Sequence, residues 1–334
     1  MTLNSLGFAV PDPAMEASLV AGMVRVETAL RTACRSEDPF LDEAARYLVE
    51  AGGKRFRPLM TLLAAHCGEP GGALREDVIH SAVVCELTHL ATLYHDDVMD
   101  EAEVRRGAPS ANARWDNTLA ILAGDFLFSR ASNLLADLGP AAVRLQARTF
   151  ERLVMGQIHE TEGPGDGADP VAHYLDVLAD KTGSLIATSA EFGARFAGAD
   201  EATVQALRGF AEQYGLAFQI SDDILDVASE SDQSGKTPGT DLREGIPTLP
   251  VLYVLQGDDP AEQRLRELVS GPLRDDADHV EALGLLRTSP AIEHARATLK
   301  EYADGAREAL AAITDVNVVG AFHSLVDHVI SRTG

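Results

Sequence analysis

Two short runs of aspartate end apolar stretches of this chain. They are DDVMD, with Asp96, Asp97 and Asp100, and DDILD, with Asp222, Asp223 and Asp226. Carboxylates four residues apart share one face of a helix, where they repel one another and raise a carboxyl pKa. A divalent cation removes the repulsion, and Mg²⁺ prefers oxygen ligands while keeping positions for water and phosphate. One run alone could be a solvated helix end, but the pair predicts two metal-binding turns facing across one cleft.

Basic residues cluster near these runs. They are Lys54, Arg55 and Arg57 in GGKRFRP, Arg105 and Arg106 after the first run, Lys181 in KTGS, and Lys236 after the second run. A single basic cluster is usually a solvated face. Beside two carboxylate turns, the clusters predict diphosphate clamps, because the planar fork of arginine matches phosphate oxygens. The proline that ends GGKRFRP, Pro58, is expected to break a helix.

The composition excludes several classes of function. The 334 residues include 28 Lys and Arg against 52 Asp and Glu, a formal net charge of −24, which argues against a nucleic-acid partner. Three widely spaced cysteines suggest neither a disulfide framework nor a thiolate metal site. The first residues lack a signal peptide, and no uninterrupted apolar run approaches the roughly 20 residues of a membrane span. We therefore expect a soluble, cytoplasmic protein.

Apolar residues recur at intervals of three and four along most of the chain, which is typical of helices. The segments of helical length are 15–35, 40–52, 76–101, 117–137, 140–161, 170–196, 201–228, 246–256, 260–270, 278–287, 290–313 and 315–332. The pattern predicts an all-α fold, with residues 1–334 forming a single domain. The polar stretch 229–247 is expected to be a mobile, glycine-rich loop.

Five motifs in order make the resemblance to a known family specific. They are GKRFRP (53–58), ELTHLATLYHDDVMDEAEVRRG (86–107), KTGS (181–184), FQISDDILD (218–226) and GKTPGTDLREGIPTLP (235–250). The chain resembles the trans-isoprenyl diphosphate synthases, or polyprenyl synthetases, over nearly its whole length, most of all the bacterial medium- and long-chain enzymes. The resemblance implies a single large helical bundle of the isoprenoid synthase type with a central cavity, and a homodimer.

The resemblance also implies roles for individual residues. Metal ligands would be Asp96, Asp100 and Asp222, supported by Asp97, Asp223 and Asp226. The allylic diphosphate would be held by Arg105, Lys181 and Lys236, and that of isopentenyl diphosphate by Lys54, Arg57, His89 and Arg106. Gln219 and Thr182 would lie near the reacting carbons. Ile246 departs from the pattern, because many relatives carry lysine there, so one phosphate contact is expected to be missing. His95 is expected to serve helix packing or to support a neighbouring site residue by a hydrogen bond.

The implied activity is the Mg²⁺-dependent head-to-tail (1′-4) condensation of isopentenyl diphosphate onto an allylic primer, farnesyl or geranylgeranyl diphosphate. Mn²⁺ is expected to substitute. The aspartates would act as metal ligands rather than as a general acid and base, and we find no nucleophilic triad. Metal ions would neutralise the departing diphosphate, and water must be excluded from the allylic cation.

Product length would depend on the residues before Asp96. Short-chain relatives commonly carry bulky aromatics four and five positions upstream, where this chain has Thr92 and Ala91, with Thr88 and Leu87 one turn further. The open face predicts a C30–C50 product, such as a quinone side-chain precursor, unless Phe126 or Phe128 forms the floor of the tunnel.

Several alternatives remain at this point. The chain could be a short-chain (C15–C20) synthase or a non-catalytic subunit of a heteromeric synthase. A terpene cyclase or a metal-binding bundle without catalysis fits less well, since neither needs GKRFRP and His89. An apolar segment such as 117–135 could form the dimer interface, and transient membrane contact on product release is expected.

Overall fold

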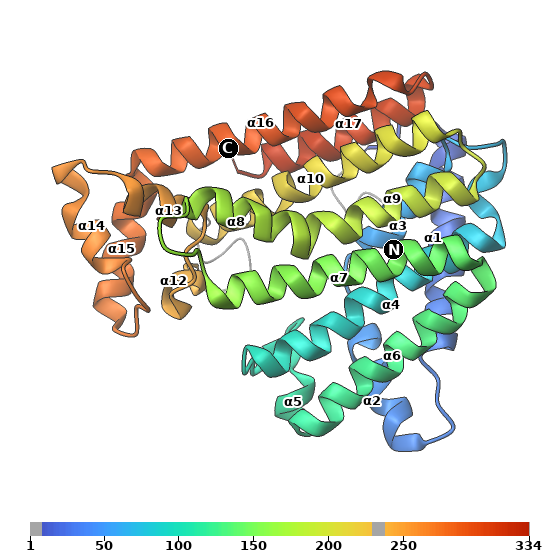
Figure 1. The fold of residues 1–334 in the computed structure, drawn as a ribbon, viewed down its shortest axis with the longest axis horizontal. Coiled ribbons are helices and arrows are strands. Elements are labelled where there is room, and N and C mark those ends of the chain that lie inside the picture. The colour runs from blue at the N-terminus through green and yellow to red at the C-terminus, as the bar shows by residue number, and fades with distance from the viewer. Residues whose placement is uncertain (1–8, 229–237, 334) are drawn as a thin grey trace. The chain divides into compact units, whose positions relative to one another are not determined.

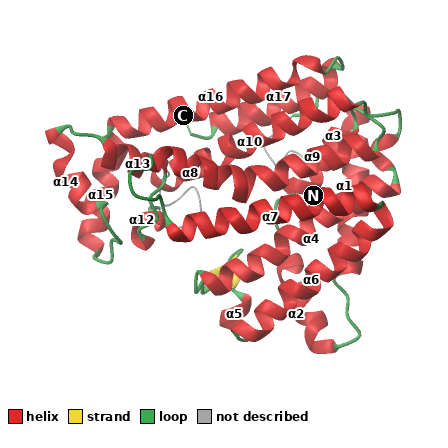
Figure 2. Ribbon diagram, viewed as in Figure 1, coloured by secondary structure: helices red, strands yellow, loops and turns green. Residues whose placement is uncertain are grey.

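The computed structural model describes residues 9–228 and 238–333. Helices account for nearly all of the regular structure (Figures 1 and 2). In this part of the chain the sheet structure is one antiparallel hairpin, in which β1 (Val104–Arg105) pairs with β2 (Ala108–Pro109). The predicted all-α class is therefore confirmed. Lys236 and the first part of the predicted loop 229–247, residues 229–237, lie outside the described residues.

The chain divides into two compact units. Unit 1 comprises 1–151, 185–208 and 310–322, and unit 2 comprises 152–184, 209–309 and 323–334. The two clusters of aspartates consequently belong to different units, DDVMD to unit 1 and DDILD to unit 2. The expectation of a single domain over 1–334 stays a prediction.

Unit 1 contains the helices of the first half of the chain. They are α1 (Pro13–Ala33), α2 (Pro39–Glu50), α3 (Phe56–Ala65), α4 (Glu76–Met99), α5 (Ala111–Arg114) and α6 (Asn117–Leu138), with the 3-10 turns η2 (Gly72–Leu74) and η5 (Leu310–Ala312). Four helices contain a boundary between the units, namely α7 (Pro140–Glu162), α9 (Ser184–Phe196), α10 (Glu201–Ala228) and α17 (Val316–Ser331).

Unit 2 contains the remaining elements. They are α8 (Pro170–Leu178), the π-helical turn η3 (Ala179–Gly183), α12 (Thr240–Glu244), α13 (Leu249–Gln256), the 3-10 turn η4 (Pro260–Glu262), α14 (Gln263–Leu268), α15 (Asp276–Thr288) and α16 (Pro290–Ala309). In its core, α13 packs against α16 and α8 through residues such as Val251, Val254 and Ile292.

Local sequence explains where several helices begin. Asp12, Asp38 and Asp169 each precede a proline at the first helical position, and each side chain accepts a hydrogen bond from a backbone N–H of the first turn. The aspartate satisfies an otherwise unpaired donor, while proline needs no donor there and has the backbone angle of a helix already. These Asp-Pro pairs therefore fix the starts of α1, α2 and α8.

Helix α4, which carries DDVMD, is the centre of unit 1 and packs on α6, α3 and α1. The contact with α6 is close, because a Cβ added at Gly124 would stand 2.3 Å from Nε2 of His95. His95 Nε2 also lies 3.2 Å from the carbonyl oxygen of Ile121. The expected packing role of His95 is thus confirmed.

Helix α6 is long and apolar enough, by length and composition, to cross a membrane, the one such helix in the described part of the chain. It carries Asp125, Arg130 and Asp137, so its apolar residues do not form one uninterrupted run of the roughly 20 residues that a membrane span needs. Its buried side packs on α4, which accounts for much of its apolar character.

Three local expectations were wrong. Pro58 does not break a helix but lies in the first turn of α3, where its missing N–H costs nothing; the first helical hydrogen bond runs from Leu59 N to Arg55 O at 3.1 Å. The segment 229–247 is not loop throughout, since Thr240–Glu244 forms α12. The segment 170–196, predicted as one continuous helix, is interrupted by the π-helical turn η3.

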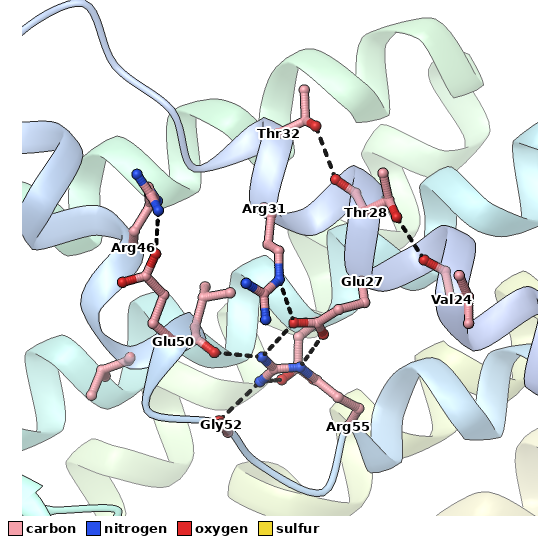
Figure 3. A network of polar contacts seen from close by, with 12 residues as sticks. Val24, Glu27, Thr28, Arg31, Thr32, Arg46, Glu50, Gly52 and Arg55 are labelled. Atoms are coloured by element: carbon pink, nitrogen blue, oxygen red, sulfur yellow. Dashed lines mark hydrogen bonds and ion pairs between the residues drawn. The ribbon is translucent and has the colours of Figure 1, made fainter. Parts of the chain in front are cut away.

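A buried arginine fixes the loop between α2 and α3 (Figure 3). Arg55 Nε donates to Glu27 at 3.0 Å, and Nη1 donates to Glu86 at 3.2 Å. The remaining donors reach backbone oxygens, with Nη1 3.1 Å from Gly52 O and Nη2 2.8 Å from Val49 O. The side chains of Arg55 and Glu86 are only 4% and 2% exposed, so each charge depends on the other for compensation.

We expect Arg55→Met to lower the free energy of unfolding by about 3–5 kcal/mol, because it leaves Glu86 buried without its counter-charge. Arg31→Met is the matched control, since Arg31 also pairs with Glu27 at 3.0 Å but is 56% exposed. The control should cost less than about 1 kcal/mol. Urea denaturation measures both variants, and equal losses would contradict a special role for the buried pair.

Candidate functional site

The first carboxylate cluster ends α4. Asp96 is half-buried, Asp97 is buried and Asp100 caps the helix in an exposed position. The backbone N–H of Asp100 donates to the carbonyl oxygen of Asp96 at 2.8 Å, so the helical ladder continues to the cap. Asp96 and Asp100 therefore lie one turn apart on the same face of α4, as the spacing predicted.

Asp97 points into unit 1 and pairs with the hairpin. Its Oδ1 accepts a hydrogen bond from Arg105 Nε at 2.6 Å, and its buried Oδ2 has no hydrogen-bond partner within residues 9–228 and 238–333. Burial raises the pKa of Asp97, and the charge of Arg105 opposes this shift. Two predicted site residues are thus paired with each other, and Asp97 holds Arg105 beside the carboxylate cluster. This agrees with a role for Asp97 in supporting the predicted metal ligands.

A basic cluster surrounds His89 on α4. Burial is the largest cause that lowers the pKa of His89 well below its usual value, followed by the charges of Arg57, Arg106, Arg105 and Arg55. Arg57 comes from α3, and Arg105 and Arg106 from the hairpin and its turn. Three of the four residues predicted for one diphosphate, Arg57, His89 and Arg106, are therefore brought together within unit 1. The fourth, Lys54, is exposed on the neighbouring loop.

Arg57 and Arg106 are guanidinium groups whose burial favours the binding of an anion. Burial lowers the pKa of both guanidinium groups, and the Nε of Arg57 has no partner within the described ranges. Arg106 Nη1 donates to Leu48 O at 2.7 Å and also to Gly52 O. A Cβ at Gly53, whose φ is +139°, would stand 3.0 Å from the guanidinium carbon of Arg106. A glycine at this position therefore lets Arg106 approach the loop.

The second carboxylate cluster, on α10, gives each aspartate a different partner. Asp222 Oδ1 lies 2.7 Å from Nη1 of Arg332. Asp226 accepts hydrogen bonds from the backbone N–H groups of Thr240 and Asp241, both at 3.3 Å, at the start of α12. The cluster is thus tied to the turn after α17 on one side and to α12 on another.

Asp223 is buried and held by two side chains of unit 2. Tyr174 on α8 donates to its Oδ2, and Gln219, one turn earlier on α10, donates to its Oδ1 at 3.2 Å. Burial raises the pKa of Asp223 to about 7, although both hydrogen bonds favour the ionised form. The structure thus orients Gln219 through Asp223, whereas sequence analysis had placed it only near the reacting carbons.

Lys181 and Thr182 lie on the π-helical turn η3. Lys181 pairs with Glu160 on α7. Arg152 fixes the same turn, with Nε 2.7 Å from Asp180 Oδ1 and Nη1 2.8 Å from Glu212. Such π turns widen a helix locally and are frequent at functional sites. Ile246, the departure from the family pattern, is 45% exposed and offers no charge.

The predicted chain-length residues lie on the side of α4 that packs into unit 1. Ala91, Thr88 and Leu87 are buried, and Thr92 is partly buried. Thr88 Oγ1 accepts a hydrogen bond from Gln146 of α7 at 2.8 Å. The candidate floor residues make other aromatic contacts: the Phe128 ring lies 4.5 Å from that of Phe150 and 5.9 Å from that of His95, and Phe126 lies beneath the guanidinium of Arg130 at 4.7 Å.

Sequence analysis missed Tyr174, Arg332 and Glu160 as partners of site residues. Tyr174 lies seven residues before Lys181 of KTGS. This spacing indicates a place near the site only after KTGS has been identified as a site motif. Arg332 follows Asp222 by more than a hundred residues, and no local pattern connects them. Pairings of this kind depend on tertiary structure.

The aspartates of the two clusters suit Mg²⁺, because all of their side-chain donors are carboxylate oxygens. One of these oxygens, the buried Asp97 Oδ2, also lacks a hydrogen-bond partner among the described residues. Within those same residues no group of three or more His, Cys, Asp or Glu side chains is arranged to hold a metal ion. The residues therefore fit magnesium by their chemistry, with neither cluster being a complete metal cage by itself.

We expect the stability of the metal-free protein to fall as pH rises from about 4 to 7 through Asp223. Folded Asp223 retains its proton up to a pKa of about 7, against 3.8 for an ordinary aspartate, so the folded state binds more protons in this window. Asp223→Asn should remove that part of the pH dependence. Thermal unfolding in a chelator measures it, with exposed Asp137→Asn as the control, and an unchanged slope in Asp223→Asn would refute the shift.

Comparison with known proteins agrees with this geometry. The model of the Polyprenyl synthetase family matches residues 38–286. The chain is 49% identical over 328 residues to a nonaprenyl diphosphate synthase of Mycobacterium tuberculosis, covering 98% of this chain and 97% of that protein. A geranylgeranyl pyrophosphate synthase from Corynebacterium glutamicum, solved with calcium and isoprenyl diphosphate, matches with a TM-score of 0.88 and 46% identity over 98% of this chain and 99% of that one.

A decaprenyl diphosphate synthase from Rhodobacter capsulatus matches with a TM-score of 0.86 and 34% identity, covering 96% of this chain and 99% of that one. Each of these relatives matches nearly the full length of the chain. The carboxylate clusters, the basic cluster around His89 and these likenesses lead to one conclusion: the chain belongs to the polyprenyl synthetase family and is a prenyltransferase.

Proposed function

We propose that this chain is an all-trans polyprenyl diphosphate synthase that condenses isopentenyl diphosphate head-to-tail (1′-4) onto an allylic diphosphate. The observation that carries the proposal is the pairing of two DDxxD clusters with a separate basic cluster of Arg57, His89 and Arg106. Two diphosphates need two sets of partners. Likeness to a synthase solved with calcium and isoprenyl diphosphate supports the same conclusion.

Asp96, Asp100 and Asp222 would hold Mg²⁺, with Asp97, Asp223 and Asp226 in support. The bound ion would neutralise charge on the departing diphosphate and act as a Lewis acid and template. Mn²⁺ has similar oxygen chemistry and would substitute. The chain needs such ions, because its net charge of −24 otherwise repels anionic substrates.

The basic residues would divide between the two substrates. Arg57, His89 and Arg106, with Lys54 from the exposed loop, would bind isopentenyl diphosphate. His89 is neutral near pH 7, so it would contribute a directed N–H while the arginines supply the charge. The allylic diphosphate would be held by Arg105, Lys181 and Lys236.

In the reaction, the bond between the allylic C1 and its diphosphate oxygen breaks, and the double bond of isopentenyl diphosphate forms a new carbon–carbon bond there. One proton leaves the resulting cation, and the departing diphosphate is its natural acceptor. Thr182 and Gln219 would line the reacting carbons. The hydrogen bond from Gln219 to Asp223 would fix the orientation of the amide.

We infer a C30–C50 product, a length that suits a quinone side chain, made from farnesyl or geranylgeranyl diphosphate. Ala91 and Thr92 are small at the positions before Asp96, and two relatives carry the names nonaprenyl and decaprenyl diphosphate synthase. A short-chain (C20) synthase is the second candidate, because the Corynebacterium relative is named as a geranylgeranyl pyrophosphate synthase at 46% identity.

Residues 1–334 would act as one domain in a homodimer. In unit 1, α6 exposes Ile121 and Leu122, which are 42% and 54% accessible and suit burial in an interface between two copies. A native mass of about twice 35.6 kDa tests this. Cys34, Cys67 and Cys85 are all free thiols, which supports a cytoplasmic location. A long apolar product would bring transient membrane contact on release.

Incubation with labelled isopentenyl diphosphate, Mg²⁺ and each allylic primer in turn tests the activity. We expect chain elongation that a chelator abolishes, and a fall of at least about a hundredfold in kcat for Asp96→Ala or Asp222→Ala, because each removes charge stabilisation of the leaving group. The exposed substitution Asp137→Ala should keep full activity. An absence of elongation with any primer would refute the proposal.

We expect Ala91→Phe to shorten the product by several isoprene units, because the ring would occupy the buried side of α4 beside Thr88. Ala91→Ser is the matched control, as it adds one atom and should leave the length unchanged. Reversed-phase chromatography of the dephosphorylated products measures both, and thermal melts confirm that each variant folds. An unchanged distribution in folded Ala91→Phe would remove Ala91 from the tunnel.

A further inference from the structure

Arg332, in the turn after α17, binds the start of the second carboxylate cluster through an ion pair and two hydrogen bonds. Its Nη1 lies 2.7 Å from Asp222 Oδ1, its Nε donates to Ser221 Oγ at 2.7 Å, and its Nη2 donates to Phe218 O at 2.8 Å. The three partners occupy positions i, i+3 and i+4 of α10, one face of a single helical turn. All three nitrogens of the guanidinium therefore contact the same turn of α10.

The surroundings of Arg332 hold it in this position. Its side chain is 14% exposed, and its guanidinium stacks over the Phe218 ring at 4.5 Å. Ser221 Oγ donates in turn to Val329 O at 3.0 Å, and Arg296 Nε donates to Thr333 O at 3.0 Å. All of these residues belong to unit 2. Such a network is expensive to rearrange, in contrast to an exposed ion pair.

We propose that Arg332 is a positioning residue that holds one oxygen of Asp222 and, as a fixed positive charge, sets the metal affinity of the DDILD cluster. This inference rests on the proposed function, in which Asp222 binds Mg²⁺. A carboxylate offers two oxygens, and the guanidinium engages Oδ1, so the metal must share the carboxylate with a cation already in place. Arg332 thereby weakens metal binding while it orients the ligand.

The physical reason is Coulomb repulsion at short range. A guanidinium and a divalent ion on the same carboxylate are separated by only a few ångströms, where repulsion is strong in a partly buried site. In the metal-free protein the same charge offsets the repulsion between Asp222 and its neighbours. The pairing would therefore keep the cluster ordered before metal arrives and allow the metal to leave with the released diphosphate.

Substitutions separate charge from structure. Arg332→Gln removes the charge, and Arg332→Lys keeps the charge but loses the fork. Ser221→Ala removes one hydrogen bond of the guanidinium and leaves every charge in place. Arg307→Gln is the matched control, because Arg307 also joins α16 to α17, through Asp304 and Asp327, and its ion pairs among the described residues do not involve α10.

Binding of Mn²⁺ to the full chain, followed by electron paramagnetic resonance, tests the inference without turnover. We expect Arg332→Gln to bind Mn²⁺ about ten-fold more tightly than the wild type, and Ser221→Ala about two-fold more tightly, as repulsion is removed or relaxed. Arg332→Lys should stay near the wild-type affinity, since it retains the charge, and Arg307→Gln should leave the affinity unchanged, since exposed pairs contribute little.

Unchanged or weaker Mn²⁺ binding in Arg332→Gln would overturn the inference, as would an equal gain in Arg307→Gln, which would mean that only net charge matters. If Arg332→Gln does not fold, Ser221→Ala decides by the same criterion. Failure of the proposed function looks different: Asp222→Asn would then leave Mn²⁺ binding unchanged, whatever Arg332→Gln does.

Discussion

The buried charge of Arg55 is the constraint on which the rest of unit 1 depends. A guanidinium removed from water needs partners for its charge and its N–H groups. Arg55 finds them in Glu27 and the carbonyl oxygen of Gly52 (Figure 3), and also in Glu86 and the carbonyl oxygen of Val49. Reaching all four partners forces the loop into unusual conformations, with φ of +50° at Arg55 and +139° at Gly53. That loop carries Arg57 into α3 and presents the Gly52 carbonyl oxygen to Arg106.

Several charged side chains of the candidate site likewise each have a partner within the protein. Asp97 pairs with Arg105, Asp222 with Arg332, and Lys181 with Glu160, while Asp223 is held by neutral Tyr174 and Gln219. In a chain with a net charge of −24, each further carboxylate adds electrostatic repulsion unless a partner compensates its charge. These contacts hold the carboxylates and bases of the candidate site in place in the metal-free protein.

Much of this could be predicted from the sequence, for physical reasons that differ between residues. The 3.6-residue period indicated the helices, and the fixed spacing of DDVMD and DDILD indicated shared helix faces, because both depend on local geometry. The clustering of Arg57, His89 and Arg106 also agrees with the family resemblance. Helix α3 was missed because Pro58 was taken as a breaker, although proline is tolerated in a first turn.

Long-range pairings could not be predicted. Nothing local distinguishes Arg55, which is buried, from Lys54 and Arg57 in the same motif, since its burial depends on Glu27 and Glu86 on two other helices. The π-helical turn that carries Lys181 depends on contact with α7, where a Cβ at Gly156 would stand 2.9 Å from Asp180 and Lys181 side-chain atoms. Arg332 reaches Asp222 only through the packing of α17 on α10.

The proposed function requires both carboxylate clusters to act on one metal-bound allylic diphosphate. A double-mutant cycle with Asp96→Asn and Asp222→Asn, read out as Mn²⁺ affinity in the presence of a non-reactive allylic diphosphate analogue, tests it most directly. Strong coupling is expected: each single variant weakens binding, and the double variant loses little beyond the worse single one. Losses of binding free energy that simply add would instead show two independent metal sites and would contradict the proposed function.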